Sequence, residues 1–193
     1  MRIGIFGGTF NPPHNGHKKL ADELPGRLSL DLLIIMPTHI PPHKGASLLA
    51  CDEDRLNMCR LCFENSSTVV SDIELKREGK SYTVDTLTEV KKLYPDDELY
   101  FLMGSDMLLS FHSWREPERI LETANICAVS RHEGETQKLE EYISCHFADC
   151  KEKFKVIDFE PVDISSTEIR NGLRFDMLPE KVAAYIKERG LYA

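Results

Sequence analysis

The sequence contains 193 residues, of which 41% are hydrophobic and 29% charged, and its formal net charge is −8. No apolar run approaches the roughly 20 residues that span a bilayer, and the negative charge argues against a protein that coats nucleic acid, which needs an extended basic face. The length suits one domain over residues 1–193, and the first residues lack a secretion-signal pattern, so we expect a cytoplasmic protein.

Apolar, β-rich runs alternate with helix-like segments along the whole chain. The apolar runs predict strands at Ile3–Phe6, Leu32–Met36, Val69–Ile73, Leu99–Met103, Ile126–Val129 and Lys155–Phe159. The other segments predict helices at His17–Leu24, Asp54–Glu64, Thr83–Tyr94, Glu116–Glu122, Ser166–Leu173 and Glu180–Glu188. This alternation predicts an α/β fold: a Rossmann-like doubly wound parallel sheet with helices on both faces.

Polar breaks between these elements predict loops. They are "LPGRLS" at residues 24–29, "PTHIPPHKGAS" at residues 37–47 and "SRHEGET" at residues 130–136. The second break is long and rich in Pro, His and Gly, so we expect it to be an active-site flap.

The stretch "RIGIFGGTFNPPHNGH", residues 2–17, leads from the first strand to a helix that is expected to start near Gly16. Glycines at the strand end let a bound group approach the backbone, and a helix N-terminus favours an anion. His14 and His17 frame that terminus, so we expect them to meet phosphate. The stretch holds no Walker lysine and no G-x-G-x-x-G. A capping or packing role is the alternative, and a zinc site is disfavoured because carboxylates and thiols are lacking nearby.

A second stretch, "ISSTEIR" at residues 164–170, has the sequence of a capping box, because Ser165 is followed three residues later by Glu168. A well-formed helix start does not explain Arg170, which is expected to reach a ligand together with the hydroxyls of Ser166 and Thr167. Two helix N-termini, two histidines and an arginine predict a polyphosphate cradle suited to nucleotidyl transfer.

The six cysteines are expected to be free thiols, because the chain is long and lacks a secretory signal. Cys59 and Cys62 form a C-x-x-C, and Cys145, His146 and Cys150 form a short cluster. No second C-x-x-C completes a tetrahedral zinc site, so metal binding is the less favoured alternative.

Together, "GGTFNPPHNGH" and "ISSTEIR" resemble the signatures of the nucleotidyltransferase superfamily that carries T/H-x-G-H. Three further stretches, "PPHK" at 41–44, "KSYTVDT" at 80–86 and "GSDMLLSFHSWREPERIL" at 104–121, resemble the bacterial nicotinate-nucleotide adenylyltransferases. The resemblance covers nearly the whole chain. It implies transfer of the adenylyl group of ATP to nicotinate mononucleotide, which gives deamido-NAD and pyrophosphate.

The resemblance also implies roles for individual residues. The catalytic group would be His14, His17, Lys44 and Arg170. ATP would contact Gly7, Gly8, Thr9, Phe10, Gly16, Gly104, Asp106, Ile164, Ser165, Ser166 and Thr167. Nicotinate mononucleotide would contact Thr83, Trp114, Arg115 and Arg131. Mg²⁺ would accompany ATP, held by phosphates and water and not by a protein cage.

Several alternatives stay open at this point. Trp114 is also read as a core or rim aromatic, and Asp106 as the cap of a helix. Asn11 replaces an Asp of many bacterial members, and "SRHEG" replaces S-R-P-G, which weakens the assignment of Arg131. The alternative functions are a non-catalytic nucleotide sensor and another adenylyl- or cytidylyltransferase. The expected partners are small molecules, with no nucleic acid and no membrane, and self-association into a homo-oligomer is left open.

Overall fold

The computed structural model describes residues 1–39, 49–130 and 134–192, and contains a six-stranded sheet. The strands are β1 (Arg2–Gly8), β2 (Leu32–Pro37), β3 (Thr68–Val70), β4 (Glu98–Gly104), β5 (Asn125–Ser130) and β6 (Phe154–Asp158). Every strand pairs in parallel with its neighbours, in the order β3-β2-β1-β4-β5-β6. The predicted fold class is confirmed, and each predicted strand is present.

Helices cover both faces of this sheet, because successive residues of a strand point to opposite sides. The helices are α1 (Asn15–Leu28), α2 (Asp52–Cys62), α3 (Thr83–Leu93), α4 (Ser105–Leu108), α5 (Pro117–Thr123), α6 (Glu135–His146), α7 (Ser166–Arg170) and α8 (Glu180–Arg189). Leu33 and Ile35 pack in a core with α1, α2 and α8, whereas Ile34 and Met36 pack in a second core with α3, α4, α5 and α6. None of the helices in the described ranges is long and apolar enough to cross a membrane.

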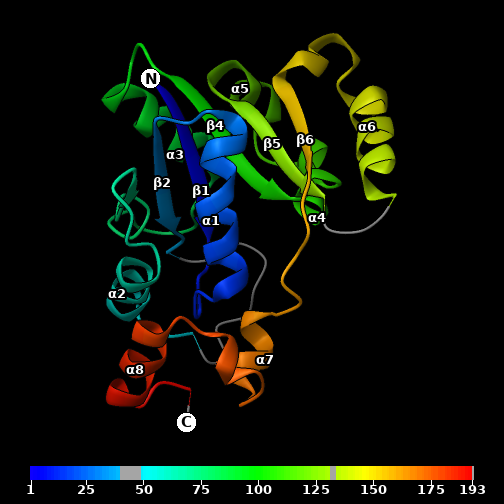
Figure 1. Ribbon diagram of the computed structural model, residues 1–193. Coiled ribbons are helices and arrows are strands. Elements are labelled where there is room, and N and C mark those ends of the chain that lie inside the picture. Colours follow the sequence, from blue (N-terminus) through cyan, green and yellow to red (C-terminus); the bar gives the residue numbers. More distant parts are fainter. Residues whose placement is uncertain (40–48, 131–133, 193) are drawn as a thin grey trace.

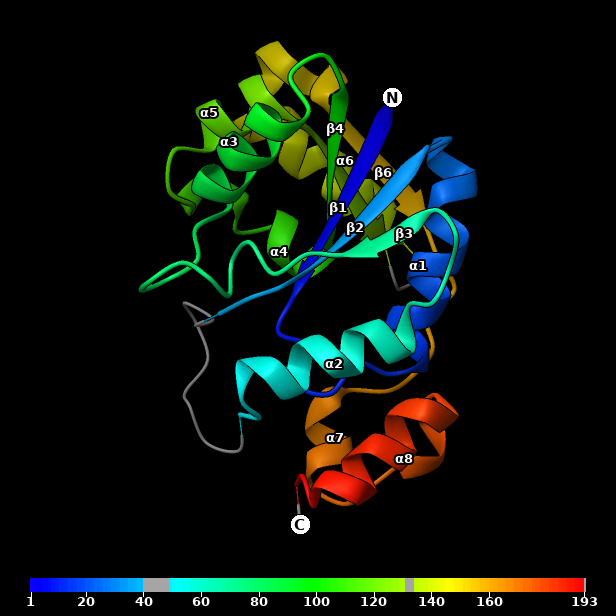
Figure 2. The same cartoon turned by 90° about the vertical axis from the view of Figure 1, so that its left-hand side faces the viewer.

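The strand order reverses direction at β1 and β4, where the chain leaves toward opposite faces. In an open parallel sheet, ligands bind beyond the carboxyl ends of the strands at such a switch point. In Figures 1 and 2, α2, α7 and α8 lie together beyond the carboxyl ends of β1 and β2. The two sequence stretches expected to bind phosphate therefore meet at the end of the sheet where a ligand is expected.

Some boundaries differ from the sequence prediction. The predicted loop at residues 24–29 is wrong, because α1 continues through Pro25 to Leu28. Leu24 and Leu28 are both buried in the core, and this packing outweighs the loss of one helical hydrogen bond at proline.

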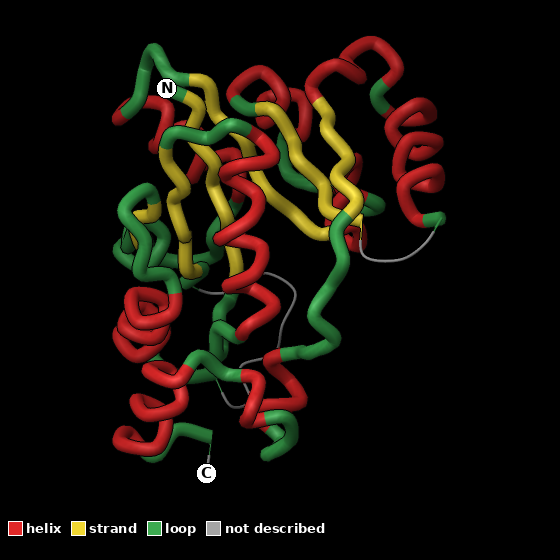
Figure 3. The backbone as a smooth tube through the Cα atoms, viewed as in Figure 1, coloured by secondary structure: helices red, strands yellow, loops and turns green. Residues whose placement is uncertain are grey.

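The predicted loop at residues 130–136 is too long, since α6 begins at Glu135, and α6 itself was not predicted. α7 ends at Arg170 and not at Leu173. Figure 3 shows α6 as a separate helix beside the sheet edge.

Candidate functional site

The start of α1 carries the two histidines that are expected to meet phosphate. His14 is the N-cap, His17 lies in the first turn, and their rings stack with centroids 3.8 Å apart. The backbone N–H of His14 donates to Nδ1 of His17 over 3.3 Å, so a neutral His17 ring carries its proton on Nε2. The ring of Phe10 makes a T-shaped contact with His17 at 5.1 Å. His17 is therefore an oriented donor at a helix N-terminus, where anions are favoured.

Gly16 makes this stacking geometrically feasible. A Cβ on Gly16 would lie 3.1 Å from the ring of His14 and 3.3 Å from the side chain of Ile164. Both distances are tighter than ordinary van der Waals contact. The glycine of H-x-G-H thus gives room to His14 on one side and to the C-terminal stretch on the other.

The loop after β1 turns sharply at Phe10, which has a positive φ of 47°. Such a backbone is uncommon for a non-glycine residue and costs free energy. The ring of Phe10 folds back over Gly8, where a Cβ would lie 2.9 Å from it. Gly8 therefore accommodates Phe10, a reason that the sequence alone did not indicate. At Gly7 the nearest side chain to a Cβ would be the ring of Phe101 at 3.7 Å, an ordinary contact.

The C-terminal stretch is bonded directly to this loop. The hydroxyl of Ser166 donates to the carbonyl of Pro12 over 2.9 Å. The guanidinium of Arg170 donates to the carbonyl of Asn11 over 2.7 Å and to the hydroxyl of Thr167 over 3.0 Å. The predicted capping box is present, because Ser165 and Glu168 bond reciprocally. Two helix N-termini were expected to face phosphate. The second of them belongs to α7, which has only five residues, so its helix dipole is small.

Asn11, the departure from the more usual Asp, is buried at the centre of this loop. Its Oδ1 accepts from the backbone N–H of Ala50 over 3.0 Å and from the hydroxyl of Tyr192 over 2.6 Å. A carboxylate oxygen would accept the same two bonds, which explains why either residue fits the loop. Tyr192, at the other end of the chain, is a contact that no sequence pattern predicted.

The carboxyl end of β4 provides a second group of predicted residues. Gly104 ends β4 and is the N-cap of α4, and Asp106 lies in the first turn of α4 with an exposed side chain. The alternative that Asp106 caps this helix is therefore wrong. Because β4 lies next to β1 in the sheet, its end adjoins the end of β1, at Gly7 and Gly8.

A third group contains Thr83, Trp114 and Arg115, three of the four residues expected to bind nicotinate mononucleotide. Thr83 is the first residue of α3, directly after its N-cap Tyr82. The guanidinium of Arg115 lies 4.8 Å from the centre of the Tyr82 ring and 3.7 Å from the carboxylate of Asp85. Trp114 is half-buried and packs against Phe101 and Phe111, so its interpretation as a rim aromatic fits as well.

Two predicted residues, Lys44 and Arg131, lie outside the described ranges. The predicted flap at residues 37–47 lies outside them as well, apart from its first residues Pro37, Thr38 and His39.

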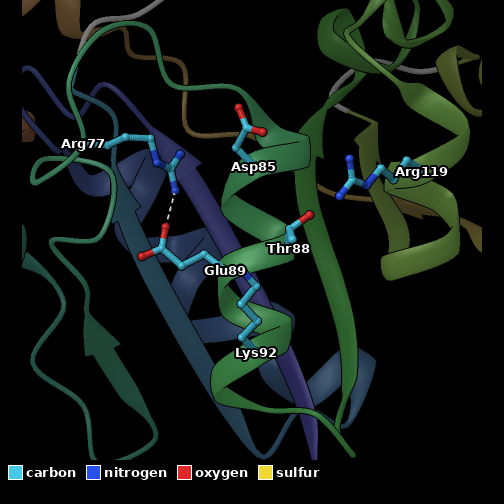
Figure 4. A pocket seen from close by; sticks show the side chains of 6 residues that line it. All are labelled: Arg77, Asp85, Thr88, Glu89, Lys92 and Arg119. Carbon is cyan, nitrogen blue, oxygen red and sulfur yellow. Dashed lines mark hydrogen bonds and ion pairs between the residues drawn. The ribbon is translucent and has the colours of Figure 1, made fainter.

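A surface cavity of about 520 Å³ lies beside α3 and α5 (Figure 4). Its charged lining includes Arg77 and Glu89, which form an ion pair at 2.5 Å. None of the sequence-predicted residues lines it. The complete lining is Arg77, Asp85, Thr88, Glu89, Lys92 and Arg119. This cavity borders the third group only through Asp85 and is not the candidate site.

The six cysteines are free, and the C-x-x-C pair is buried. Burial raises the pKa of Cys62 to about 12 and the pKa of Cys59 well above its usual range, so neither readily forms the thiolate that binds metals. His146 stacks on His112 with centroids 4.5 Å apart. In the part of the chain that the structure describes, no three His, Cys, Asp or Glu side chains are grouped to hold a metal ion.

We predict that the protein, purified without chelators, contains no stoichiometric zinc. Buried neutral thiols would have to release protons in apolar surroundings before they could coordinate the ion. Elemental analysis of the purified protein before and after dialysis against a chelator checks this. A content of about one zinc per chain that the chelator removes would contradict the prediction and favour the Cys/His site.

Comparisons with known proteins bear on the family and the fold. A family model described as cytidylyltransferase-like matches residues 5–172. A relative from Shewanella sp. (strain MR-4), named probable nicotinate-nucleotide adenylyltransferase, is 36% identical to this chain over 100% of this chain and 99% of its own length. A relative of the same name from Geobacter metallireducens is 39% identical over 100% of this chain and 98% of its own length. The Plasmodium falciparum nicotinic acid mononucleotide adenylyltransferase complexed with NaAD has the same fold, with a TM-score of 0.78 at 21% identity over 99% of this chain and 97% of that one. The chain therefore belongs to the cytidylyltransferase-like family and, within it, to the nicotinate-nucleotide adenylyltransferases.

Proposed function

We propose that this protein transfers the adenylyl group of ATP to nicotinate mononucleotide, which yields deamido-NAD and pyrophosphate. The observation that carries the proposal is the direct bonding of Ser166 and Arg170 to the Asn11–Pro12 backbone, next to the stacked pair His14 and His17. The six free thiols fit a reducing compartment, and we propose the cytoplasm.

The reaction needs positioning and charge stabilisation more than covalent chemistry by the protein. A phosphate oxygen of nicotinate mononucleotide attacks the α-phosphorus of ATP, a new P–O bond forms, and the bond to the β-phosphate oxygen breaks with loss of pyrophosphate. Nε2–H of His17 donates to the phosphate oxygens as their charge rises, and Arg170 faces the leaving pyrophosphate. Gly104 and Asp106 are proposed to hold the ribose hydroxyls, because a carboxylate accepts two hydrogen bonds.

Mg²⁺ is part of the substrate in this proposal. Asp106 is the one acidic residue among the predicted site residues, and Mg²⁺ held by protein usually has one or two carboxylates together with phosphates and water. The donor set therefore fits an ion that arrives as Mg-ATP, which neutralises part of the phosphate charge.

Pyrophosphate release over a panel of acceptors tests the function. Nicotinate mononucleotide, nicotinamide mononucleotide, phosphopantetheine and glycerol 3-phosphate are each offered with ATP and with CTP. We expect the highest kcat/KM for the pair of ATP and nicotinate mononucleotide. Higher activity with CTP or with another acceptor would identify a different nucleotidyltransferase, and binding of ATP without turnover of any pair would indicate a sensor.

We predict that Arg170→Lys lowers kcat/KM for ATP by about 10- to 100-fold. The guanidinium already donates to the carbonyl of Asn11 and the hydroxyl of Thr167, and its remaining N–H groups are proposed to face phosphate. An ammonium cannot reproduce this planar fork, and each charge-assisted bond contributes about 1.5–3 kcal/mol. Steady-state kinetics with varied Mg-ATP measures the effect.

Arg189→Lys is the matched control, because Arg189 is exposed and bonds to Asp54 of α2, which is not among the predicted site residues. It should leave kcat/KM close to that of the wild type. Full activity of Arg170→Lys would mean that Arg170 makes no fork-like contact with phosphate.

A further inference from the structure

Arg55, on α2, has a guanidinium that is entirely buried, with 0% of the residue exposed. Burying a cation is costly unless it is paired and its N–H groups are bonded. None of the stretches that resemble the family contains this residue, and the proposed reaction does not use it. Its position therefore calls for a physical reason.

All five N–H groups of Arg55 have an acceptor. Nε donates to the carbonyl of Ala50 over 3.3 Å. One terminal nitrogen donates to the carbonyls of Thr9 over 2.9 Å and Thr38 over 2.6 Å. The other donates to the carbonyl of His39 over 3.2 Å and to the carboxylate of Asp52. Arg55 thus joins three chain segments: the loop after β1, the end of β2 and the entry to α2.

The bond to Thr9 acts on the part of the loop that has a positive φ. The Thr9 carbonyl belongs to the peptide unit that precedes Phe10, so fixing it restricts the backbone that gives Phe10 its φ of 47°. This backbone places the Phe10 ring over Gly8 and against His17.

The bond to Ala50 supports the same loop from its other side. Nε of Arg55 holds the carbonyl of Ala50, and the N–H of Ala50 donates to the side chain of Asn11. Asn11 in turn accepts from Arg170 through its backbone carbonyl. The buried guanidinium is thus connected to both sequence signatures through Ala50 and Asn11.

We propose that Arg55 is a positioning residue that holds the Gly8–Asn11 loop, and through Phe10 the His17 ring, in the geometry that adenylyl transfer requires. It contacts no substrate, since it is buried beneath the loop. The kinetic part of this inference rests on the proposed function, whereas the structural part does not. Because Arg55 uses a planar fork with five donors, a lysine with three donors cannot replace it.

The test compares Arg55→Lys with Met58→Ala. Met58 is also buried on α2 and belongs to the same apolar core as Phe10, so its truncation destabilises the protein by removing apolar contacts alone, whereas Arg55→Lys removes hydrogen bonds to the loop. Both variants are studied well below their measured Tm. For Arg55→Lys we expect kcat to fall by about 100-fold, the scale of a small misplacement of catalytic groups, with the KM for nicotinate mononucleotide changed much less. For Met58→Ala we expect kcat close to that of the wild type.

Hydrogen–deuterium exchange supplies a readout that is independent of activity. Amides at residues 7–11 should exchange faster in Arg55→Lys than in Met58→Ala, while amides of β5 should exchange alike in both. Wild-type kcat and unchanged loop exchange in Arg55→Lys would overturn the proposal, as would equal changes in both variants.

If Arg55→Lys does not fold, Asp52→Asn takes its place, because this partly exposed residue is the charge partner of Arg55, and the same faster loop exchange is expected. If the wild-type protein transfers no adenylyl group, the proposed function fails, and the exchange comparison alone decides whether Arg55 holds the loop.

Discussion

Replacing His17 with alanine is expected to lower kcat for adenylyl transfer about 100- to 1000-fold without loss of the fold, the usual scale for one lost transition-state donor. Nδ1 of His17 accepts from the N–H of His14, which directs the ring proton to Nε2. Alanine removes this donor and leaves the helix N-terminus in place. The ring is only partly buried and contacts Phe6, Phe10 and His14, so a small decrease in Tm is expected.

His112→Ala is the matched control for this variant. His112 also stacks on another imidazole, that of His146, but it is exposed and lies outside the candidate site. Single-turnover kinetics separates the chemical step from product release, and circular dichroism checks the fold. Near-normal turnover of a folded His17→Ala protein would show that His17 does not stabilise the transition state.

The four central strands could be predicted from the sequence because they are buried on both faces and therefore have continuous apolar runs. Leu33, Ile34 and Ile35, for example, are all nearly inaccessible to solvent. The prediction failed where the local signal and tertiary packing disagree. Only Leu139 and Ile143 of α6 are buried, so its polar sequence resembled a loop. Pro25 suggested a helix end, whereas the packing of Leu28 extends the helix.

The residues of the candidate site were predicted from the five stretches that resemble the family, but the contacts among them were not. An arginine in an amphipathic helix is normally solvent-exposed, so no pattern in the sequence marks Arg55 as buried. The bond from Tyr192 to Asn11 joins residues near opposite ends of the chain and depends on how α8 packs. The glycine at position 8 suggested room for a ligand, whereas its neighbour is the ring of Phe10. Contacts of this kind depend on tertiary structure and have no local signal.

Nicotinate mononucleotide is expected to exceed nicotinamide mononucleotide by about 100-fold or more in kcat/KM. The two mononucleotides differ in the substituent on the pyridine ring: a carboxylate only accepts hydrogen bonds, whereas a carboxamide also carries an NH₂ donor. Thr83 begins α3, and the first N–H groups of a helix have no partner within it. With Arg115 held beside Tyr82, this region is proposed to present donors to the substituent.

An amide NH₂ that faces such donors would leave one buried group unpaired, at a cost of roughly 1–3 kcal/mol, and would lose the charge assistance of the carboxylate in addition. These two effects together account for a preference of about 100-fold. Steady-state kinetics with both mononucleotides at saturating Mg-ATP measures it. Equal values of kcat/KM would mean that the pocket supplies an acceptor for the amide as well as donors.

A substitution at Thr83 tests whether the main chain provides this selectivity. Thr83→Pro removes the backbone N–H at the first helical position, where proline is well tolerated, and Tyr82 has the extended backbone that a following proline requires. Thr83→Ala removes the side chain and keeps the N–H. We expect the preference for nicotinate mononucleotide to fall about tenfold in Thr83→Pro, the equivalent of one charge-assisted hydrogen bond, and to persist in Thr83→Ala. Equal preferences in the two variants would place the selectivity elsewhere, whereas a loss in Thr83→Ala alone would assign it to the hydroxyl.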